Sequence, residues 1–196
     1  MGVLDSFRLD DKVMIVTGAS SGLGVAFAQA FAEAGADVVL GARRVDRLAE
    51  TAALVEAAGR KPLPVATDVS VPEQCQALVD SAIQTFGRVD ILINNAGVGS
   101  AQPATRETPE QFRSVIDVNL NGAYWVAQAC GRVMQPGSSI INIASVLGIT
   151  TADLPRPPTA RARPRSWGSP EILPSSGAPA REFGSTRWRR DSFGPR

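Results

Sequence analysis

The sequence predicts an α/β fold with a doubly wound parallel sheet. Three observations within residues 1–150 of the 196 predict it. Short runs rich in Val and Ile alternate with longer segments of helical period. The runs are apolar on both faces, which is typical of strands covered by helices on each side. Glycines follow the first run directly, where such folds turn from strand into helix. Right-handed crossovers between these units produce the doubly wound sheet.

Five strands are expected to alternate with four helices. The strands are residues 13–17, 37–41, 63–66, 89–93 and 139–144. The helices are residues 25–34, 44–58, 71–86 and 109–134. Ser70 and Glu73 have the spacing of a capping box at the start of the third helix. Thr108 followed by Pro109 is typical of a helix start and predicts the beginning of the fourth.

Two parts of the chain differ in composition. Residues 1–150 carry 11 Lys and Arg against 15 Asp and Glu, a net charge of −4, whereas residues 151–196 carry nine Arg against four acids, a net charge of +5. Eight of the 14 prolines also lie in this last segment, which has neither helical nor strand period. We expect one domain over residues 1–150 and a poorly ordered Arg/Pro-rich tail over residues 151–196.

The absent residue types exclude several classes of site. The chain has no His, which excludes His-based triads and His metal sites, and no metal site is expected. Cys75 and Cys130 lack CxxC spacing and are expected to be buried thiols in a reducing compartment. No apolar run reaches the ~18 residues of a membrane span, and the N-terminus lacks the regions of a signal peptide. These observations favour a cytoplasmic protein with no membrane partner.

Glycines between the first strand and the first helix predict an anion site. Residues 17–24 have the spacing T-G-x-x-x-G-x-G, with Gly18, Gly22 and Gly24. Glycines permit a tight turn and a close approach of the backbone to a pyrophosphate, and a helix N-terminus adds free N–H groups and the positive end of its dipole. Nucleotide binding is favoured over an ordinary turn, the alternative that a glycine-rich segment alone leaves open.

Further motifs follow the later strands. They are Asp68-Val69 after the third strand, Asn94-Asn95-Ala96-Gly97 after the fourth, Asn119 in the long helix and Ser145 after the fifth strand. With the glycine-rich spacing, these motifs resemble the short-chain dehydrogenase/reductase family over residues 9–149. The resemblance runs without interruption and places each motif at the expected element.

The resemblance implies a Rossmann-like sheet and hydride transfer between a nicotinamide cofactor and a small-molecule alcohol or carbonyl. It implies that Asn119 holds a water in a proton relay and that the Ser145 hydroxyl bonds the substrate oxygen. Family members usually form homodimers or homotetramers. The cofactor-binding residues that it implies are Gly18, Ser20, Ser21, Gly22, Leu23, Gly24, Asp68, Val69, Asn95, Ala96 and Gly97.

The end of the second strand favours NADP(H) over NAD(H). An acidic residue there would bind the ribose hydroxyls of NAD and repel the 2′-phosphate of NADP, but Ala42 occupies this position and Arg43 and Arg44 follow it. A guanidinium suits bidentate recognition of a phosphate. Arg43 is the favoured contact, with a hydroxyl supplied by Ser20 or Ser21. Alternatively, both arginines form a solvated helix start, although cations there oppose the helix dipole.

The chain departs from the family after Ser145. The family's Tyr-x-x-x-Lys, in which Tyr is the general acid or base and Lys lowers the Tyr pKa, is absent. The one Tyr is Tyr124, and the two lysines are Lys12 and Lys61. We therefore expect an incomplete domain with the first five strands, lacking the family's C-terminal strands and Tyr/Lys helix, and inactive as written. Only one of the two helices that build the family's oligomers remains.

The genetic code offers an explanation. Codons for residues 158–163 allow a shifted reading of Tyr-Cys-Ala-Ser-Lys, and the same shift allows Asn-Ala-Leu-Ala-Pro-Gly over residues 185–191, which resembles a family motif after the sixth strand. Two ordered motifs in one frame indicate a frameshift between about residues 153 and 158. One alternative is a genuine basic tail that contacts nucleic acid, which is disfavoured because basic segments are usually solvated. The other is a non-catalytic NADP-binding regulatory module.

Overall fold

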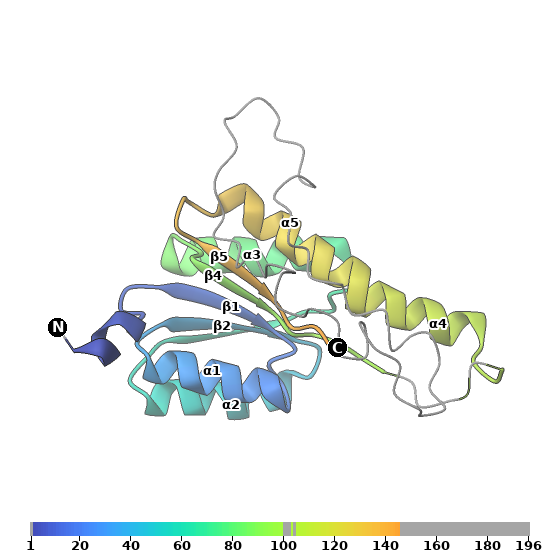
Figure 1. Cartoon of the computed structure of the whole chain (residues 1–196), viewed down its shortest axis with the longest axis horizontal. Helices are drawn as coiled ribbons and strands as arrows, with labels where there is room; N and C mark the ends of the chain where they lie inside the picture. The colour runs from blue at the N-terminus through green and yellow to red at the C-terminus, as the bar shows by residue number, and fades with distance from the viewer. Residues whose placement is uncertain (1, 100–102, 104, 146–196) are drawn as a thin grey trace, which may run out of the picture.

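The computed structural model describes residues 2–99, 103 and 105–145. The expected domain end at residue 150 and the expected tail of residues 151–196 lie outside the described residues. Figure 1 shows the described part as a sheet with helices packed against both of its faces. The α/β fold predicted from the sequence is confirmed.

Five parallel strands form one sheet in the order β3-β2-β1-β4-β5. They are β1 (Val13–Thr17), β2 (Asp37–Ala42), β3 (Pro62–Ala66), β4 (Ile91–Asn94) and β5 (Ser139–Asn142). All five coincide with predicted strands, apart from small shifts at their ends. The strand order reverses between β1 and β4, and doubly wound sheets bind ligands at such a switch point, beyond the carboxyl ends of the strands.

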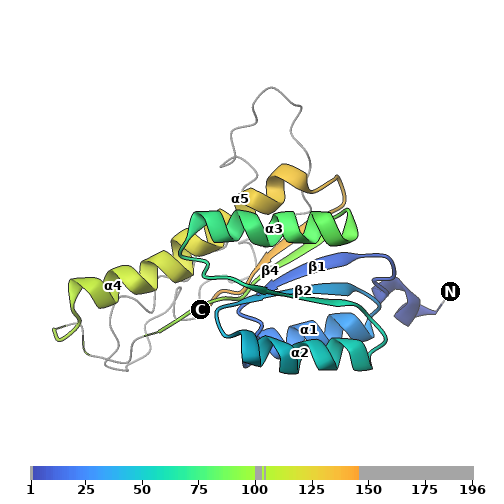
Figure 2. The ribbon, with the colours of Figure 1, turned by 180° about the vertical axis from the view of Figure 1, so that it is seen from behind.

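Helices cover both faces of the sheet. They are η1 (Val3–Phe7), α1 (Leu23–Glu33), α2 (Val45–Ala57), α3 (Pro72–Phe86), α4 (Pro109–Ile116), η2 (Asp117–Gly122) and α5 (Ala123–Val133). Figures 1 and 2 show α1 and α2 on one face and α3 and α5 on the other, with α4 extending away from the sheet. This arrangement produces the doubly wound architecture that the sequence predicted.

The strand β1 shows why the apolar runs have no polar face. Val13 and Ile15 pack into the hydrophobic core that faces α3 and α5, whereas Met14 and Val16 pack into the core that faces α1 and α2. Successive side chains of a strand point to opposite faces of the sheet. Because a helix layer covers each face, every residue of β1 is buried.

The start of α3 differs from the prediction. Val71 is the N-cap residue, and no side chain caps the helix. The Ser70 hydroxyl instead donates to Oδ1 of Asp68 at 2.7 Å, so the predicted capping box of Ser70 and Glu73 is wrong. The Ser70 hydroxyl is thus bound to a nearby carboxylate rather than to the helix. Pro72 in the first turn has no N–H, so one fewer backbone donor there needs a partner.

The long helix predicted to Met134 is interrupted by a π-helical turn. Its start is confirmed, because Thr108 Oγ1 accepts from the Gln111 N–H at 3.3 Å and the Thr108 N–H donates to Gln111 Oε1 at 3.0 Å. Winding then changes from α to π over η2 and returns to α in α5. Periodicity alone did not predict this turn. π-Helical turns within α-helices are frequent at functional sites.

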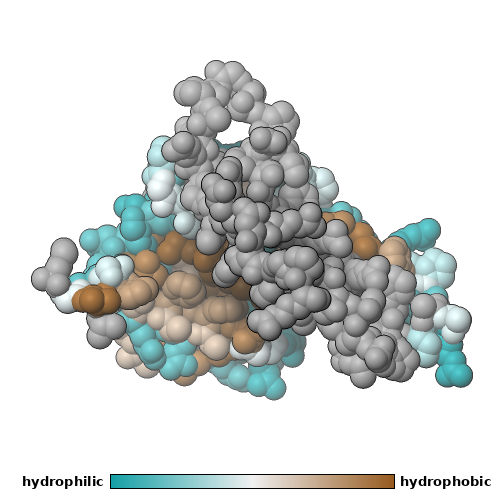
Figure 3. Space-filling view, viewed as in Figure 1, coloured by the Kyte–Doolittle hydropathy of each residue, from teal (hydrophilic) through white to brown (hydrophobic). Residues whose placement is uncertain are grey.

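Among the described strands, β5 has a neighbour on one side only. Its Ile141 side chain is 43% exposed. In Figure 3, hydrophobic residues in brown gather on the visible face and hydrophilic residues in teal lie around them. An apolar strand edge without a partner is open to pairing with further strands.

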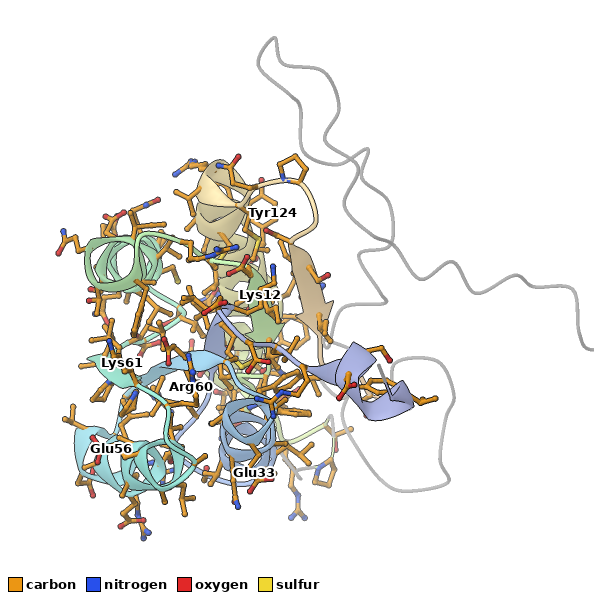
Figure 4. All side chains as sticks on the ribbon, turned by 90° about the vertical axis from the view of Figure 1, so that its left-hand side faces the viewer. Lys12, Glu33, Glu56, Arg60, Lys61 and Tyr124 are labelled. Carbon is orange, nitrogen blue, oxygen red and sulfur yellow. The ribbon has the colours of Figure 1, made fainter. Side chains whose placement is uncertain are left out.

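A polar cluster fixes the amino ends of β1 and β4, at the edge of the sheet opposite the switch point. The mostly buried Asp90 carboxylate accepts from the Val13 N–H at 3.0 Å and from Nε and Nη2 of Arg88 at 2.7 and 2.6 Å. Lys12 Nζ lies 3.6 Å from it, and Figure 4 shows Lys12 on this edge. Burial alone would raise the Asp90 pKa, but the hydrogen bonds from Arg88 and Val13 and the two cations outweigh it and lower the pKa.

Replacing Asp90 with Asn should lower the free energy of unfolding by about 1–3 kcal/mol at neutral pH, because charge-assisted hydrogen bonds are lost. Since the folded-state pKa of Asp90 is lowered, its contribution is present above the unfolded-state pKa of about 4 and is lost as the pH falls through the folded-state value. The difference from wild type should therefore shrink below about pH 4. Urea unfolding across this range measures it, with exposed Asp80→Asn as the control. A difference independent of pH would contradict the assignment.

Candidate functional site

A cleft of about 530 Å³ opens beyond the carboxyl ends of the strands, at the switch point. The loops that follow β1, β2, β3 and β4 all contribute to its wall. All of the residues predicted to bind a cofactor line it except Gly22 and Gly24. Thr67, Val98 and Val118, which the sequence did not single out, line it as well.

The glycine-rich loop has no room for side chains at two positions. Gly18 has a φ of +68°, and a Cβ there would lie 2.9 Å from Cα of Ala96. A Cβ on Gly24 would overlap the Gly18 carbonyl, whose carbon would be 2.8 Å away, and would meet Nδ2 of Asn95 at 2.9 Å. Gly24 therefore does not touch the cleft but lets α1 pack against the loop that forms its wall.

Asn95 fastens the loop after β4 to the loop after β1. Its Nδ2 donates to the carbonyls of Thr17 at 3.0 Å and Gly18 at 3.4 Å. In return, Thr17 Oγ1 accepts from the N–H groups of Asn95 and Ala96, both at 3.0 Å. Thr17 was not among the predicted site residues. The role of its hydroxyl depends on the pairing of β1 with β4, which places the Asn95 and Ala96 N–H groups beside it.

The two arginines after β2 have different partners. Arg43 is largely exposed, and its Nη1 lies 3.9 Å from Oδ2 of Asp68. Arg44 Nη2 donates to Ser20 Oγ at 3.2 Å and to Ser21 Oγ at 2.9 Å. Both guanidinium groups thus lie on the cleft wall. The sequence favoured Arg43 as the phosphate contact, but it is Arg44 that reaches the two predicted serines.

Asp68 is held as a carboxylate on the cleft wall. Its Oδ1 accepts from the N–H of Ser70 at 3.0 Å as well as from the Ser70 hydroxyl. Burial alone would raise the Asp68 pKa, but these hydrogen bonds and the charge of Arg43 lower it. Its neighbour Val69 packs against Gly122 of η2, where an added Cβ would lie 2.8 Å from the Val69 carbonyl oxygen.

Asn119, which is buried in the π-helical turn, is bound to the backbone of Val98 on the cleft wall. Its Oδ1 accepts from the Val98 N–H and its Nδ2 donates to the Val98 carbonyl, both at 2.8 Å. This pair of hydrogen bonds joins η2 to the segment after β4. Asn119 itself does not line the cleft, whereas its neighbour Val118 does. The water-holding role implied by the resemblance stays a prediction.

Ser145 is half-buried beyond the carboxyl end of β5. It is not among the residues that line the cleft. Its predicted role toward a substrate oxygen also stays a prediction. The thiols of Cys75 and Cys130 are buried, as expected, and burial raises the Cys75 pKa to about 11, so that this thiol stays protonated near neutral pH.

The described part of the chain offers neither a cluster of metal ligands nor a membrane-spanning helix. No group of three or more Asp, Glu, Cys or His side chains within residues 2–99, 103 and 105–145 could hold a metal ion. In the same part of the chain, every helix is too short or too polar to span a bilayer.

A family model described as short chain dehydrogenase matches residues 12–154, which are 143 of the 196 residues. The chain belongs to the short chain dehydrogenase family. This match confirms the resemblance that the motifs from the glycine-rich loop to Ser145 indicated.

The chain is similar to several curated short chain dehydrogenases. An uncharacterized oxidoreductase of Methylorubrum extorquens is 43% identical over 143 residues, which cover 71% of this chain and 57% of the relative. Galactitol 2-dehydrogenase of Agrobacterium fabrum is 38% identical over 144 residues, which cover 72% of this chain and 55% of the relative. The chain thus spans a little over half the length of these relatives.

Solved structures of the family share the fold. A short-chain type dehydrogenase/reductase of Mycobacterium marinum has a TM-score of 0.79 and 36% identity, covering 83% of this chain and 68% of that one. A short chain dehydrogenase of Burkholderia cenocepacia, solved in complex with NADP, has a TM-score of 0.75 and 30% identity, covering 80% of this chain and 64% of that one. The chain therefore shares the fold of solved short chain dehydrogenases over most of its own length.

Proposed function

We propose that the cleft binds NADP(H) and that this chain supplies the cofactor-binding part of an oxidoreductase acting on an alcohol or carbonyl. The observation that carries the proposal is the close packing of the glycine-rich loop after β1, of which Gly18 lines the cleft. Gly18 and Gly24 leave no space for side chains and bring the loop backbone to the N-terminus of α1. Backbone N–H groups and the helix dipole at such a place attract a pyrophosphate. The residues present therefore fit a dinucleotide.

The preference for NADP(H) rests on the charges at the adenosine end of the cleft. Arg43 and Arg44 contribute two cations to the wall, and Ala42 stands where an acid would repel a 2′-phosphate. Arg44 already holds the hydroxyls of Ser20 and Ser21, so one guanidinium and two hydroxyls form a preassembled donor group. Within the described part of the chain, the guanidinium of Arg43 is joined to Asp68 by a long ion pair of 3.9 Å, so it can turn toward a phosphate.

NADP(H), when bound, would supply or accept the hydride. Ser145 would hold the substrate oxygen, and Asn119 would keep Val98 in place on the cleft wall through its two hydrogen bonds. Neither residue supplies a proton near neutral pH, since a serine hydroxyl and an amide do not ionise there. The absence of Tyr-x-x-x-Lys from the sequence favours a second candidate, a regulatory module that binds NADP(H) without catalysis.

Calorimetric titration of the folded chain should show binding of NADPH at least about tenfold tighter than binding of NADH, because the 2′-phosphate adds charge-assisted hydrogen bonds. Arg43→Asp should reverse this preference, since a carboxylate repels the phosphate and can accept from ribose hydroxyls. Arg47→Asp makes the same change of charge at an exposed residue one helical turn away and should leave the preference intact.

Each outcome of the titration has a separate meaning. Failure of both cofactors to bind the wild-type chain would contradict the proposed function. Tighter binding of NADH would overturn only the assignment of NADP(H). Binding of NADPH by a chain that gains no turnover after repair of its reading frame would favour the regulatory module over the enzyme.

A further inference from the structure

Both backbone polar groups of Ala19 in the glycine-rich loop are held, the N–H by β2 and the carbonyl by α2. Ala19 is fully buried and does not line the cleft, although its neighbours Gly18 and Ser20 do. Its N–H donates to the Gly41 carbonyl at 3.3 Å, and its carbonyl accepts from Thr51 Oγ1 at 2.8 Å. Without the Thr51 hydroxyl, the buried Ala19 carbonyl would lose this hydrogen-bond donor, which is unfavourable.

Two carbonyl oxygens lie within hydrogen-bond distance of the Thr51 hydroxyl. A threonine within a helix often donates to the carbonyl four residues earlier. Here that carbonyl belongs to Arg47 and lies 3.3 Å from Thr51 Oγ1, whereas the Ala19 carbonyl lies 2.8 Å away. A hydroxyl has one proton to donate, so the shorter contact takes it. Thr51 is 1% exposed, and water does not compete for this bond.

The bond to Ala19 also orients the next residue of the loop. In a trans peptide the carbonyl of one residue and the N–H of the next point in opposite directions. The chain has no cis peptide bonds among its described residues. Because the Ala19 carbonyl points toward Thr51 on α2, the Ser20 N–H points away from α2. Ser20 lines the cleft, so Thr51 fixes the direction of a backbone donor on the cleft wall.

A second contact from α2 acts on the same segment. Arg44, the N-cap residue of α2, donates to the hydroxyls of Ser20 and Ser21. The two contacts differ in their surroundings, because Thr51 is buried and Arg44 is exposed. They also differ in position, since Arg44 lines the cleft, where it can contact a bound ligand directly, and Thr51 does not. A change at Thr51 therefore reaches a bound cofactor only through the loop.

We infer that Thr51 is a positioning residue for the cofactor, which pre-organises the glycine-rich loop by its hydrogen bond to the Ala19 carbonyl. The inference rests on the proposed binding of NADP(H). It assigns to α2 a role in affinity that is shared by both cofactors, because the loop contacts the part common to NADPH and NADH. Choice between the cofactors stays with Arg43, Arg44 and the serine hydroxyls.

Thr51→Val removes the hydroxyl and keeps the shape of the side chain, whereas Thr51→Ser keeps the hydroxyl and removes a methyl group. Affinities for NADPH and NADH are measured by calorimetry on the full chain, at a temperature well below the lowest melting temperature of the three proteins. Thr51→Val should bind both cofactors about tenfold more weakly, a change of about 1.4 kcal/mol. The ratio of the two affinities should stay that of wild type. Thr51→Ser should stay within about threefold of wild type.

Hydrogen exchange supplies a readout that does not depend on turnover. The Ser20 and Ser21 amides should exchange faster in folded Thr51→Val than in wild type, while the amides of β4, which α2 neither directly precedes nor directly follows in the chain, stay unchanged. A Thr51→Val protein with a lowered melting temperature but unchanged affinities and unchanged loop exchange would show a merely structural role and overturn the inference.

Two further outcomes decide the matter where Thr51→Val yields no folded protein. Thr51→Ser retains the donor, so a folded Thr51→Ser with both affinities reduced more than about tenfold would overturn the inference. A folded Thr51→Ser that keeps both affinities and the protection of the Ser20 amide would support it. Failure of the wild-type chain to bind either cofactor is a different result, which refutes the proposed function rather than the role of Thr51 in shaping the loop.

Discussion

The chain of 196 residues should reduce carbonyls at least about 10²–10⁴-fold more slowly than a variant whose reading frame is shifted back from the codon for Pro158. That is the range by which general acid catalysis accelerates a reaction, and no residue after Ser145 in the printed sequence supplies an acid of the right kind. Arginine is too basic to exchange protons near neutral pH. Codons allowed for residues 158–163 let the shifted frame encode a Tyr and a Lys four residues apart.

Oxidation of NADPH with a panel of carbonyl compounds measures this effect, and restoration should raise kcat more than it changes the KM for NADPH. The control is the restored variant carrying Ser145→Ala, which should again lose activity, because the resemblance assigns to Ser145 the hydrogen bond to the substrate oxygen. Resequencing the codons for residues 150–196 is the companion measurement. A confirmed frame, together with a shifted frame that encodes neither Tyr-x-x-x-Lys nor Pro-Gly, would refute the frameshift.

Gly24→Ala should lower the free energy of unfolding by about 1–3 kcal/mol and weaken binding of NADPH by about tenfold or more. The added Cβ would overlap the Gly18 carbonyl and press on Nδ2 of Asn95. Both neighbours belong to the wall of the cleft, and Asn95 is fixed by its bonds to Thr17 and Gly18, so neither can move without disturbing the other. Urea unfolding and calorimetry measure the two effects.

Gly99→Ala is the matched control for this substitution. It adds the same methyl group beyond the carboxyl end of β4, at a residue whose new Cβ meets no atom of the described residues within 4 Å apart from its chain neighbours. The φ of Gly99 is not in the left-handed region. We expect Gly99→Ala to stay within about 0.5 kcal/mol of wild type, as surface substitutions usually do. Equal effects of the two substitutions on stability and on NADPH affinity would show that the close approach of α1 to the loop does not cause the effects at Gly24.

Local patterns predicted the elements because each depends on residues close together in the chain. The alternation of apolar runs and helical segments is such a pattern, and it led to all five strands. Thr108 and Gln111 are three residues apart, and their capping box formed where the start of the helix was predicted. Ser70 shows the limit of such patterns, since its hydroxyl donates to Asp68 and the helix begins after Val71 with no side-chain cap.

The sequence by itself determined the fold, the family motifs, most of the residues on the cleft wall and the absence of an acid directly after β2. Only the tertiary structure decided how these residues are held. Thr17 binds Asn95, Thr51 binds Ala19, and Asn119 binds Val98, across separations of 78, 32 and 21 residues. A polar side chain can satisfy its hydrogen bonds with many partners, and burial selects the one that the packing of distant elements brings within reach. Periodicity and motif spacing do not predict which distant partner a buried polar side chain will bind.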